Sequence, residues 1–229
     1  MNPDFAIILN FKTTSDFDAD FLVKTARNIG ARAVMSSDPA AFKEACEKYT
    51  IFLADEQAGL DLTSVNVIDT MVNNRKNGEA TIINIPVNDG KFDEATQKLL
   101  DTINSWMHQF GHAFNEGKPS PLTVSDGFIL ENRHADYQKY VFLKDIPAKI
   151  VVEGLDKEPN RVEWIEHRTE LDFAMKDGKL TINLIKSDDV FDWNVLRIQA
   201  HRPEDDIIHT EFERKSILDW ECFFYSILV

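Results

Sequence analysis

Short apolar runs alternate with amphipathic segments along the first half of the chain. Apolar runs at 5–11, 31–35, 51–54 and 80–85 are compact enough for buried strands, and punctuation by Gly, Pro, Asn or Asp bounds several of them. Each run is followed by apolar positions at helical spacing. This alternation predicts four strands and four helices in a mainly parallel sheet with right-handed crossovers, either as a half-barrel or as an open doubly wound sheet.

Capping residues set the expected limits of the helices. Side chains that cap a first turn precede each amphipathic segment, and these are Asp18, Asp38, Thr63 or Ser64, and Asp93. Pro39 suits the first helical position after Asp38. Gly30, Gly78 and Gly111 are placed to end the first, third and fourth helices.

The pattern changes after the linker at 117–121. Short runs with polar, Gly or Pro punctuation follow at 127–131, 139–143, 149–152, 162–165, 171–175, 180–184 and 195–200. Asp177-Gly178 lies between two of them and is a strong two-residue hairpin signal. The spacing predicts an antiparallel β-sandwich. We therefore expect a βα domain at 1–117 and a β-sandwich domain at 118–229.

Composition narrows the compartment and the partners. The 229 residues carry a formal net charge of −14, which disfavours nucleic acid and anionic membrane surfaces. No apolar run approaches the ~18 residues of a membrane span, and no leader pattern is evident, so we expect a cytoplasmic protein. Cys46 and Cys222 are expected to be free thiols. His108 and His112 lack a third ligand, so we expect neither a metal nor a cofactor.

Several of these segments resemble the family-29 α-L-fucosidases. The order of Asn77-Gly78, an apolar strand ending in Asn84-Ile85-Pro86, Asp89-Gly90, and a helix with Trp106 and Gly111 resembles the last strand and helix of that family's barrel. Phe17-Asp18-Ala19-Asp20 with Gly30-Ala31 resembles an early barrel helix and the strand after it. Weaker matches, such as Val162-Glu163-Trp164 and Leu180-Thr181-Ile182, resemble the family's C-terminal β-domain.

The same resemblance implies that family chemistry is missing here. The family's early strand ends in a His-His pair, whereas this strand ends in Ser36-Ser37-Asp38. The family's nucleophilic Asp lies in a Trp-containing motif on a middle strand, but Asp192-Trp193 and Asp219-Trp220 both lie outside the βα half. The resemblance thus implies a shortened, catalytically degenerate relative that retains a carbohydrate-binding or assembly role.

An active glycoside hydrolase with a rebuilt carboxylate site is the alternative. A retaining glycosidase needs two carboxyl groups about 5–5.5 Å apart. Asp55 and Glu56 are the candidate catalytic residues because they follow the third apolar run, and ligands collect at the carboxyl ends of parallel strands. Asn10, Ser36 and Asn84 are the candidate residues for binding a carbohydrate substrate.

The C-terminal segment 217–229 bears on assembly. It is rich in apolar and aromatic residues, which makes it unsuited to solvent. Four βα units also cannot close an eight-stranded barrel, so the edge strands need cover. We expect a homo-oligomer, most simply a dimer, and the alternative is that this segment folds back onto its own βα half.

Overall fold

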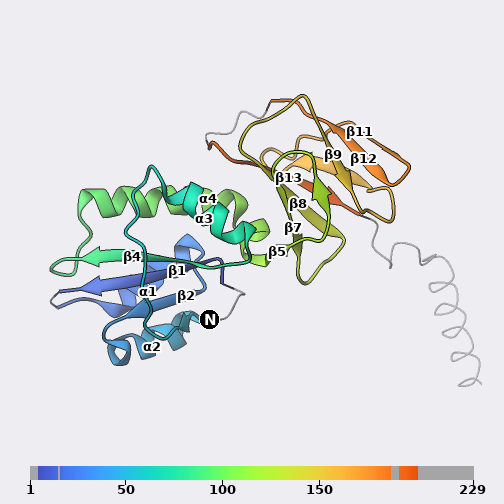
Figure 1. The fold of residues 1–229 in the computed structure, drawn as a ribbon. Helices are drawn as coiled ribbons and strands as arrows, with labels where there is room; N and C mark the ends of the chain where they lie inside the picture. The colour runs from blue at the N-terminus through green and yellow to red at the C-terminus, as the bar shows by residue number, and fades with distance from the viewer. Residues whose placement is uncertain (1–4, 15, 187–190, 201–229) are drawn as a thin grey trace, which may run out of the picture.

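The computed structural model describes residues 5–14, 16–186 and 191–200, which form a βα region joined to a β-sandwich (Figure 1). The βα region holds a parallel sheet of β1 (Ile7–Thr13), β2 (Ala33–Ser36), β3 (Phe52–Leu53) and β4 (Thr81–Val87). Its helices are α1 (Ala19–Ile29), α2 (Pro39–Tyr49), α3 (Val67–Lys76) and α4 (Glu94–Glu116). The predicted fold class, a parallel βα sheet followed by antiparallel sheets, is confirmed.

The strand order β3-β2-β1-β4 places the last strand beside the first. All four helices contribute to one apolar cluster with the sheet face that carries Leu9 and Ile83, which we call the helix face. Asn74 of α3 donates to Thr81 on this same face at 3.0 Å. Helices on one face are typical of a βα barrel, whereas a doubly wound sheet has them on both. No barrel is closed here.

The opposite face, which we call the inner face, is crossed by residues 54–61, the crossing segment (Figure 1). The segment leaves β3 at one edge of the sheet, and Ala54 packs on an apolar cluster that includes Ile8 and Met35. It reaches the opposite edge at Leu60, which forms a parallel bridge with Ile83 of β4. The Leu60 N–H donates to the Ile82 carbonyl and the Asn84 N–H donates to the Leu60 carbonyl, both at 2.9 Å. This segment therefore covers the inner face and also occupies the outer edge of β4.

Three of the predicted helix caps are confirmed. Carboxylates of Asp18, Asp38 and Asp93 accept from the backbone N–H three residues later at 3.1, 3.3 and 2.7 Å. The expected cap at Thr63 or Ser64 is wrong, because α3 begins only at Val67. The Asn66 side chain accepts from the Thr63 N–H at 2.8 Å, so these residues form a turn that precedes the helix. The third strand is also shorter than the predicted 51–54.

The expected end of the fourth helix at Gly111 is wrong as well. Helix α4 continues to Glu116, and both Ala113 and Phe114 are buried beyond the glycine. Burial of this extra apolar turn outweighs the roughly 1 kcal/mol that a mid-helix glycine costs relative to alanine. The sequence signal for a stop was therefore overridden by tertiary packing.

A buried arginine holds the end of α4. Arg75 of α3 has no exposed surface, and its Nε donates to the Phe114 carbonyl at 3.0 Å. One terminal nitrogen donates to the carbonyls of Asn115 and Gly117 at 3.2 and 2.5 Å. Burial, followed by the nearby Arg32, lowers the pKa of Arg75 to about 10, so the group remains cationic at neutral pH. A cation at this point satisfies carbonyls that the helix end leaves open and complements its dipole.

The sandwich has two antiparallel sheets. The first has the order β10-β13-β8-β7-β5, from β10 (Arg161–Trp164), β13 (Asn194–Gln199), β8 (Gln138–Leu143), β7 (Phe128–Asn132) and β5 (Gly117–Pro119). The second has the order β11-β12-β9-β6, from β11 (Phe173–Lys176), β12 (Lys179–Asn183), β9 (Lys149–Glu153) and β6 (Thr123–Val124). The predicted hairpin at Asp177-Gly178 is confirmed, with φ of 53° and 75° at the two turn residues.

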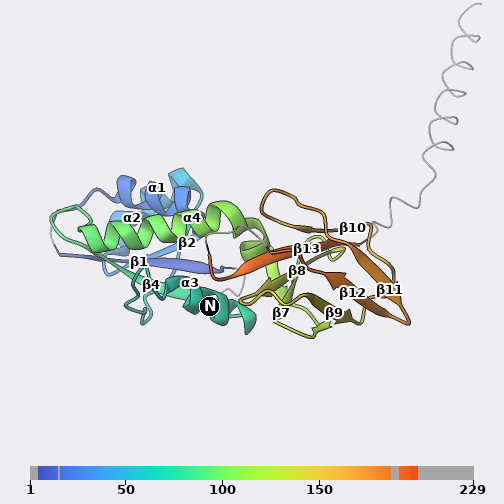
Figure 2. The ribbon, with the colours of Figure 1, turned by 90° about the horizontal axis from the view of Figure 1, so that it is seen from above.

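The first sheet of the sandwich is buried on both faces. Ile129 and Val141 face the second sheet, while Phe128 and Phe142 belong to the same apolar cluster as the βα helices. Figure 2 shows α4 running from the βα sheet to the sandwich. Helix α4 ends at Glu116 and β5 begins at Gly117, yet the first apolar cluster extends across this junction. The division into domains at 117/118 therefore stays a prediction.

We predict that Arg75→Ala lowers the free energy of unfolding by about 3 kcal/mol or more, because it leaves buried carbonyls without a donor. Arg75→Lys should fall between this variant and the wild type, since it keeps a charge but loses the planar fork. Urea denaturation checks both. The exposed Arg27, in the last turn of α1, gives a matched control, Arg27→Ala, with an expected cost below about 1 kcal/mol. Equal losses of unfolding free energy in Arg75→Ala and Arg27→Ala would contradict the role of Arg75 at the end of α4.

Candidate functional site

A chain of polar side chains lies on the inner face of the sheet, midway along β1 and β4. Asn10 of β1 and Asn84 of β4 are direct partners in the strand register. The Asn10 side-chain nitrogen donates to the Asn84 side-chain oxygen at 3.0 Å. The Asn84 nitrogen donates in turn to a carboxylate oxygen of Asp61, in the crossing segment, at 2.8 Å. The structure thus brings together two of the candidate binding residues and adds Asp61, which sequence reasoning missed.

The carboxylate of Asp61 fixes the orientation of both amides. An ionised carboxylate only accepts hydrogen bonds, so Asn84 must present its NH2 group to Asp61 and its oxygen to Asn10. Asn10 then uses its NH2 group toward Asn84, and its own oxygen is buried with no hydrogen-bond partner among the described residues. Asn10 has no exposed surface. A buried acceptor of this kind is costly unless a donor reaches it.

Gly59 closes this site from the crossing segment. A Cβ atom at Gly59 would lie 2.2 Å from the Asn84 side-chain oxygen and 3.2 Å from Cγ2 of Ile82. Only a residue without a side chain can approach the strand this closely. The crossing segment therefore lies directly on Asn84, on the inner face of the sheet.

The candidate catalytic residues of the crossing segment, Asp55 and Glu56, are both exposed to solvent. A Glu56 carboxylate oxygen lies 3.5 Å from Nζ of Lys12, and these two side chains are 57% and 42% exposed. An exposed ion pair of this kind contributes little to stability. The carboxylates of Glu56 and Asp61 are thus engaged by Lys12 and Asn84 rather than by each other.

Ser36 lies on the other side of the sheet. It pairs in register with Phe11, whose side chain belongs to the helix face, whereas Asn10 pairs with Met35 on the inner face. Its hydroxyl accepts from the Asp38 N–H at 3.2 Å. Ser36 therefore takes part in the turn that starts α2 and is separated from Asn10 and Asn84.

The βα region is also expected to hold no metal and a free thiol at Cys46. Within residues 5–14, 16–186 and 191–200, no group of three His, Cys, Asp or Glu side chains is arranged to hold a metal. Burial raises the pKa of the Cys46 thiol to about 11, which makes it a poor nucleophile. Cys222 and the 217–229 segment lie outside the described residues.

None of the helices in the described part of the chain combines the length and apolar character needed to cross a bilayer.

Comparison with known proteins identifies a shared fold. No family model and no curated protein matches the sequence. Among solved structures, an α-fucosidase from Thermotoga maritima in complex with fucose aligns with a TM-score of 0.57 and 12% identity, over 80% of this chain and 79% of that one. A GH29 α-L-fucosidase from Bacteroides thetaiotaomicron gives 0.51 and 11%, over 84% of this chain. α-L-Fucosidase isoenzyme 1 from Paenibacillus thiaminolyticus gives 0.51 and 13%, over 85%.

These alignments confirm the resemblance to the α-L-fucosidases at the level of the fold. The chain spans only 43% of the Bacteroides enzyme and 58% of the Paenibacillus enzyme, which fits a shortened relative. Identities this low carry no residue-by-residue correspondence. The chemistry of this chain therefore depends on its own side chains and their contacts.

We predict that Gly59→Ala lowers the free energy of unfolding by about 2 kcal/mol through overpacking against Asn84. In an Asn84→Ala background the same substitution should cost about 1 kcal/mol less, because the obstructing amide is gone. A double-mutant cycle by urea denaturation measures this coupling. Gly111→Ala is a matched control, since its Cβ would meet only Met107 at an ordinary 3.5 Å, and it should be neutral or stabilising. Additive effects of Gly59→Ala and Asn84→Ala would contradict the contact.

Proposed function

We propose that this protein is a catalytically degenerate α-L-fucosidase-like protein that binds carbohydrate without cleaving it. The observation that carries the proposal is the crossing segment, which covers the inner face of the sheet with Gly59 against Asn84. A hydrolase of this fold would need open strand ends to hold a sugar between two carboxyl groups. The fucosidase-like fold supports an ancestry in sugar recognition.

The state of the carboxylates also supports loss of hydrolysis. Covalent glycosidase catalysis needs one ionised nucleophile and one proton donor on opposite sides of the sugar bond. Glu56 is paired with Lys12 in solvent, and Asp61 is tied to Asn84. Neither contact aims a carboxylate at a shared reacting atom.

The alternative is an active glycoside hydrolase with a rebuilt carboxylate site. Its support is the position of three acidic side chains, Asp55, Glu56 and Asp61, in one short segment at the strand ends. Movement of the crossing segment away from β4 would be required before a sugar could lie between them. That movement would break both backbone hydrogen bonds of Leu60.

We predict that the purified protein does not hydrolyse aryl α-L-fucosides above the background rate. Release of the aryl group, followed by absorbance beside the Thermotoga maritima enzyme as a positive control, is the measurement. Wild type and the variants Asp55→Asn, Glu56→Gln and Asp61→Asn should be indistinguishable. Turnover that is abolished in any one of these variants would establish the hydrolase and remove the proposal.

We further propose that the protein is cytoplasmic and assembles as a homodimer, with neither nucleic acid nor membrane as a partner. The charge of −14 supports the exclusion of anionic partners. Leu60 already occupies the outer edge of β4, so pairing of two sheets edge to edge would have to use the short strand β3, where Phe52 is 55% exposed. The apolar segment 217–229 supports assembly through the tail instead.

Sedimentation of the full chain at high micromolar concentration should show a dimer. Deletion of residues 217–229 should convert it to a folded monomer, because the deletion removes the apolar contact and leaves the described fold intact. Circular dichroism checks that fold. A strict monomer for the full chain would refute the assembly proposal, and a deletion variant that stays dimeric would exclude the tail as the interface.

A further inference from the structure

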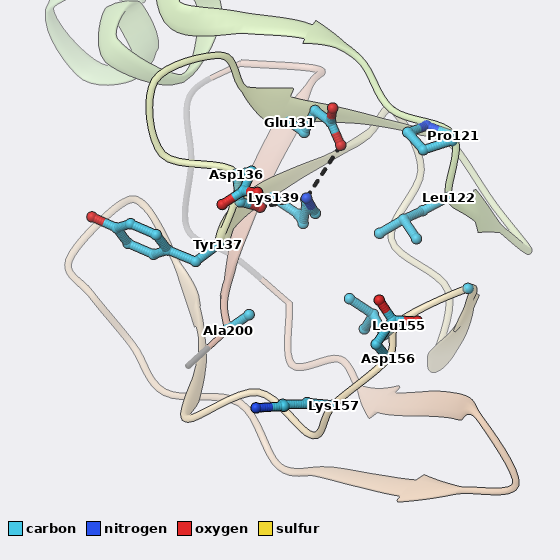
Figure 3. Close-up of a pocket in the computed structure, with 11 residues that line it drawn as sticks. Pro121, Leu122, Glu131, Asp136, Tyr137, Lys139, Leu155, Asp156, Lys157 and Ala200 are labelled. Atoms are coloured by element: carbon cyan, nitrogen blue, oxygen red, sulfur yellow. Dashed lines mark hydrogen bonds and ion pairs between the residues drawn. The ribbon is translucent and has the colours of Figure 1, made fainter. Parts of the chain in front are cut away.

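A hollow of about 450 Å³ lies at one end of the β-sandwich, between its two sheets (Figure 3). The first sheet contributes Glu131 of β7 and Lys139 of β8, and Ala200 follows β13. The loop before β6 contributes Pro121 and Leu122, and the loop after β9 contributes Gly154 and the residues up to Lys157. The volume falls within the range of small-molecule sites, and loops at the ends of a sandwich are common places for them.

The walls of the hollow are apolar on one side. Leu122 and Leu155 point into it, and both belong to the apolar core between the two sheets or pack against it (Figure 3). Gly154 allows the loop after β9 to lie close to Leu122, because its φ of 97° suits glycine and a Cβ there would lie 3.0 Å from the Leu122 side chain. The hollow is thus an opening of the sandwich core toward solvent.

The polar groups on the remaining walls are held in place. Glu131 and Lys139 are each only 13% exposed, and their charged atoms lie 3.2 Å apart. Lys118 reaches the other Glu131 oxygen at 3.1 Å, and Ser120 donates to Glu131 at 3.3 Å. Burial favours a higher pKa for Glu131, but the hydrogen bonds from Lys118 and Lys139 outweigh it and lower the pKa. This carboxylate therefore stays ionised and fixed.

The charge balance of the lining selects the class of ligand. Three carboxylates, those of Glu131, Asp136 and Asp156, stand against the ammonium groups of Lys139 and Lys157. An anionic ligand would be repelled by the three carboxylates and by a chain of net charge −14, and a cation would be repelled by the two ammonium groups. A neutral molecule with many hydroxyl groups suits both the fixed acceptors and the fixed donors, and its C–H surface suits the two leucines.

We propose that this hollow binds a neutral saccharide, at a site separate from the strand ends of the βα sheet. The choice of a saccharide among neutral polyols rests on the proposed function. Asp156 points into the hollow beside Leu155, and Lys139 enters it from β8 (Figure 3). The Tyr137 ring is directed outward at the rim (Figure 3). The sugar contacts the leucines through its C–H groups and the charged side chains through its hydroxyls.

Filling the hollow tests the proposal without removing any of its structural contacts. The Ala200 side chain points into the hollow, and its backbone N–H is anchored to the Tyr137 carbonyl at 2.7 Å, so Ala200→Trp should place an indole in the space (Figure 3). Ile185→Trp is the matched control, because Ile185 is 61% exposed and is not part of the lining. Asp156→Asn is a second variant at an exposed position, and it removes the charge with little change of shape.

Calorimetric titration of the full chain with L-fucose, methyl α-L-fucoside and D-galactose is the measurement. We expect saturable binding of at least one sugar with a dissociation constant of about 1 mM. Ala200→Trp should weaken this binding about tenfold or more, and Ile185→Trp should change it less than about twofold. Asp156→Asn should weaken it about threefold or more, through loss of a charged acceptor. Thermal denaturation confirms that each variant is folded.

Different failures lead to different conclusions. Sugar binding that survives both Ala200→Trp and Asp156→Asn but is lost in Asn84→Ala would overturn this site and leave the proposed function standing, with the ligand at the strand ends. Absence of binding by all three sugars would overturn both this site and the carbohydrate role. Binding of spermidine or sulfate in place of the sugars would overturn the assignment of a neutral ligand. Turnover of fucosides is a separate readout and bears only on the proposed function.

Discussion

A parallel sheet needs cover on both faces and protection at its edges, and four strands cannot obtain this by closing into a barrel. In this protein the helices cover one face, and the crossing segment 54–61 covers the other while Leu60 occupies the outer edge of β4. The position of Gly59 against Asn84 follows from this requirement, because the segment must lie close to the strands to cover them. The same contact places the backbone of the crossing segment over Asn84, the partner of Asn10. Cover of the inner face and closure over these two side chains thus have one physical cause.

The second half of the chain is joined to the first by polar and apolar contacts that cross the junction at 117/118. Arg75 of α3 binds carbonyls at the end of α4 and the start of β5. Asp69, also of α3, accepts hydrogen bonds from Trp193 at 2.7 Å and from Lys144 at 2.9 Å. Phe128 and Phe142 of the sandwich share an apolar cluster with the βα helices. The sandwich therefore acts as the layer that covers α3 and α4. The hollow lies between the two sheets, beside Glu131 and Lys139 of the first sheet.

Local rules predicted most of the elements, and tertiary contacts account for the failures. The β-branched apolar runs and the capping carboxylates of Asp18, Asp38 and Asp93 depend on near neighbours, so the sequence pattern located them. Gly111 failed as a stop because Phe114 is buried against a sheet formed much later in the chain. Arg75 has the sequence signature of an ordinary last-turn cation, and only its burial shows its role. For the site, Asn10 and Asn84 were named as candidate binding residues and do meet, but Asp61 comes from a segment without periodicity, and Ser36 fell on the wrong face because the exact strand register decides the side.

Amide hydrogen exchange shows whether the crossing segment is a fixed part of the sheet, held by the two backbone hydrogen bonds that join Leu60 to Ile82 and Asn84 at 2.9 Å. We expect the Leu60 and Asn84 amides to exchange as slowly as the buried amides of the β1–β4 ladder, because they open only with the sheet. Exchange of these two amides at the rate of an exposed loop would show that the segment leaves the strands readily. Asn10 and Asn84 would then be open to a ligand, and the closure over these two side chains would be contradicted.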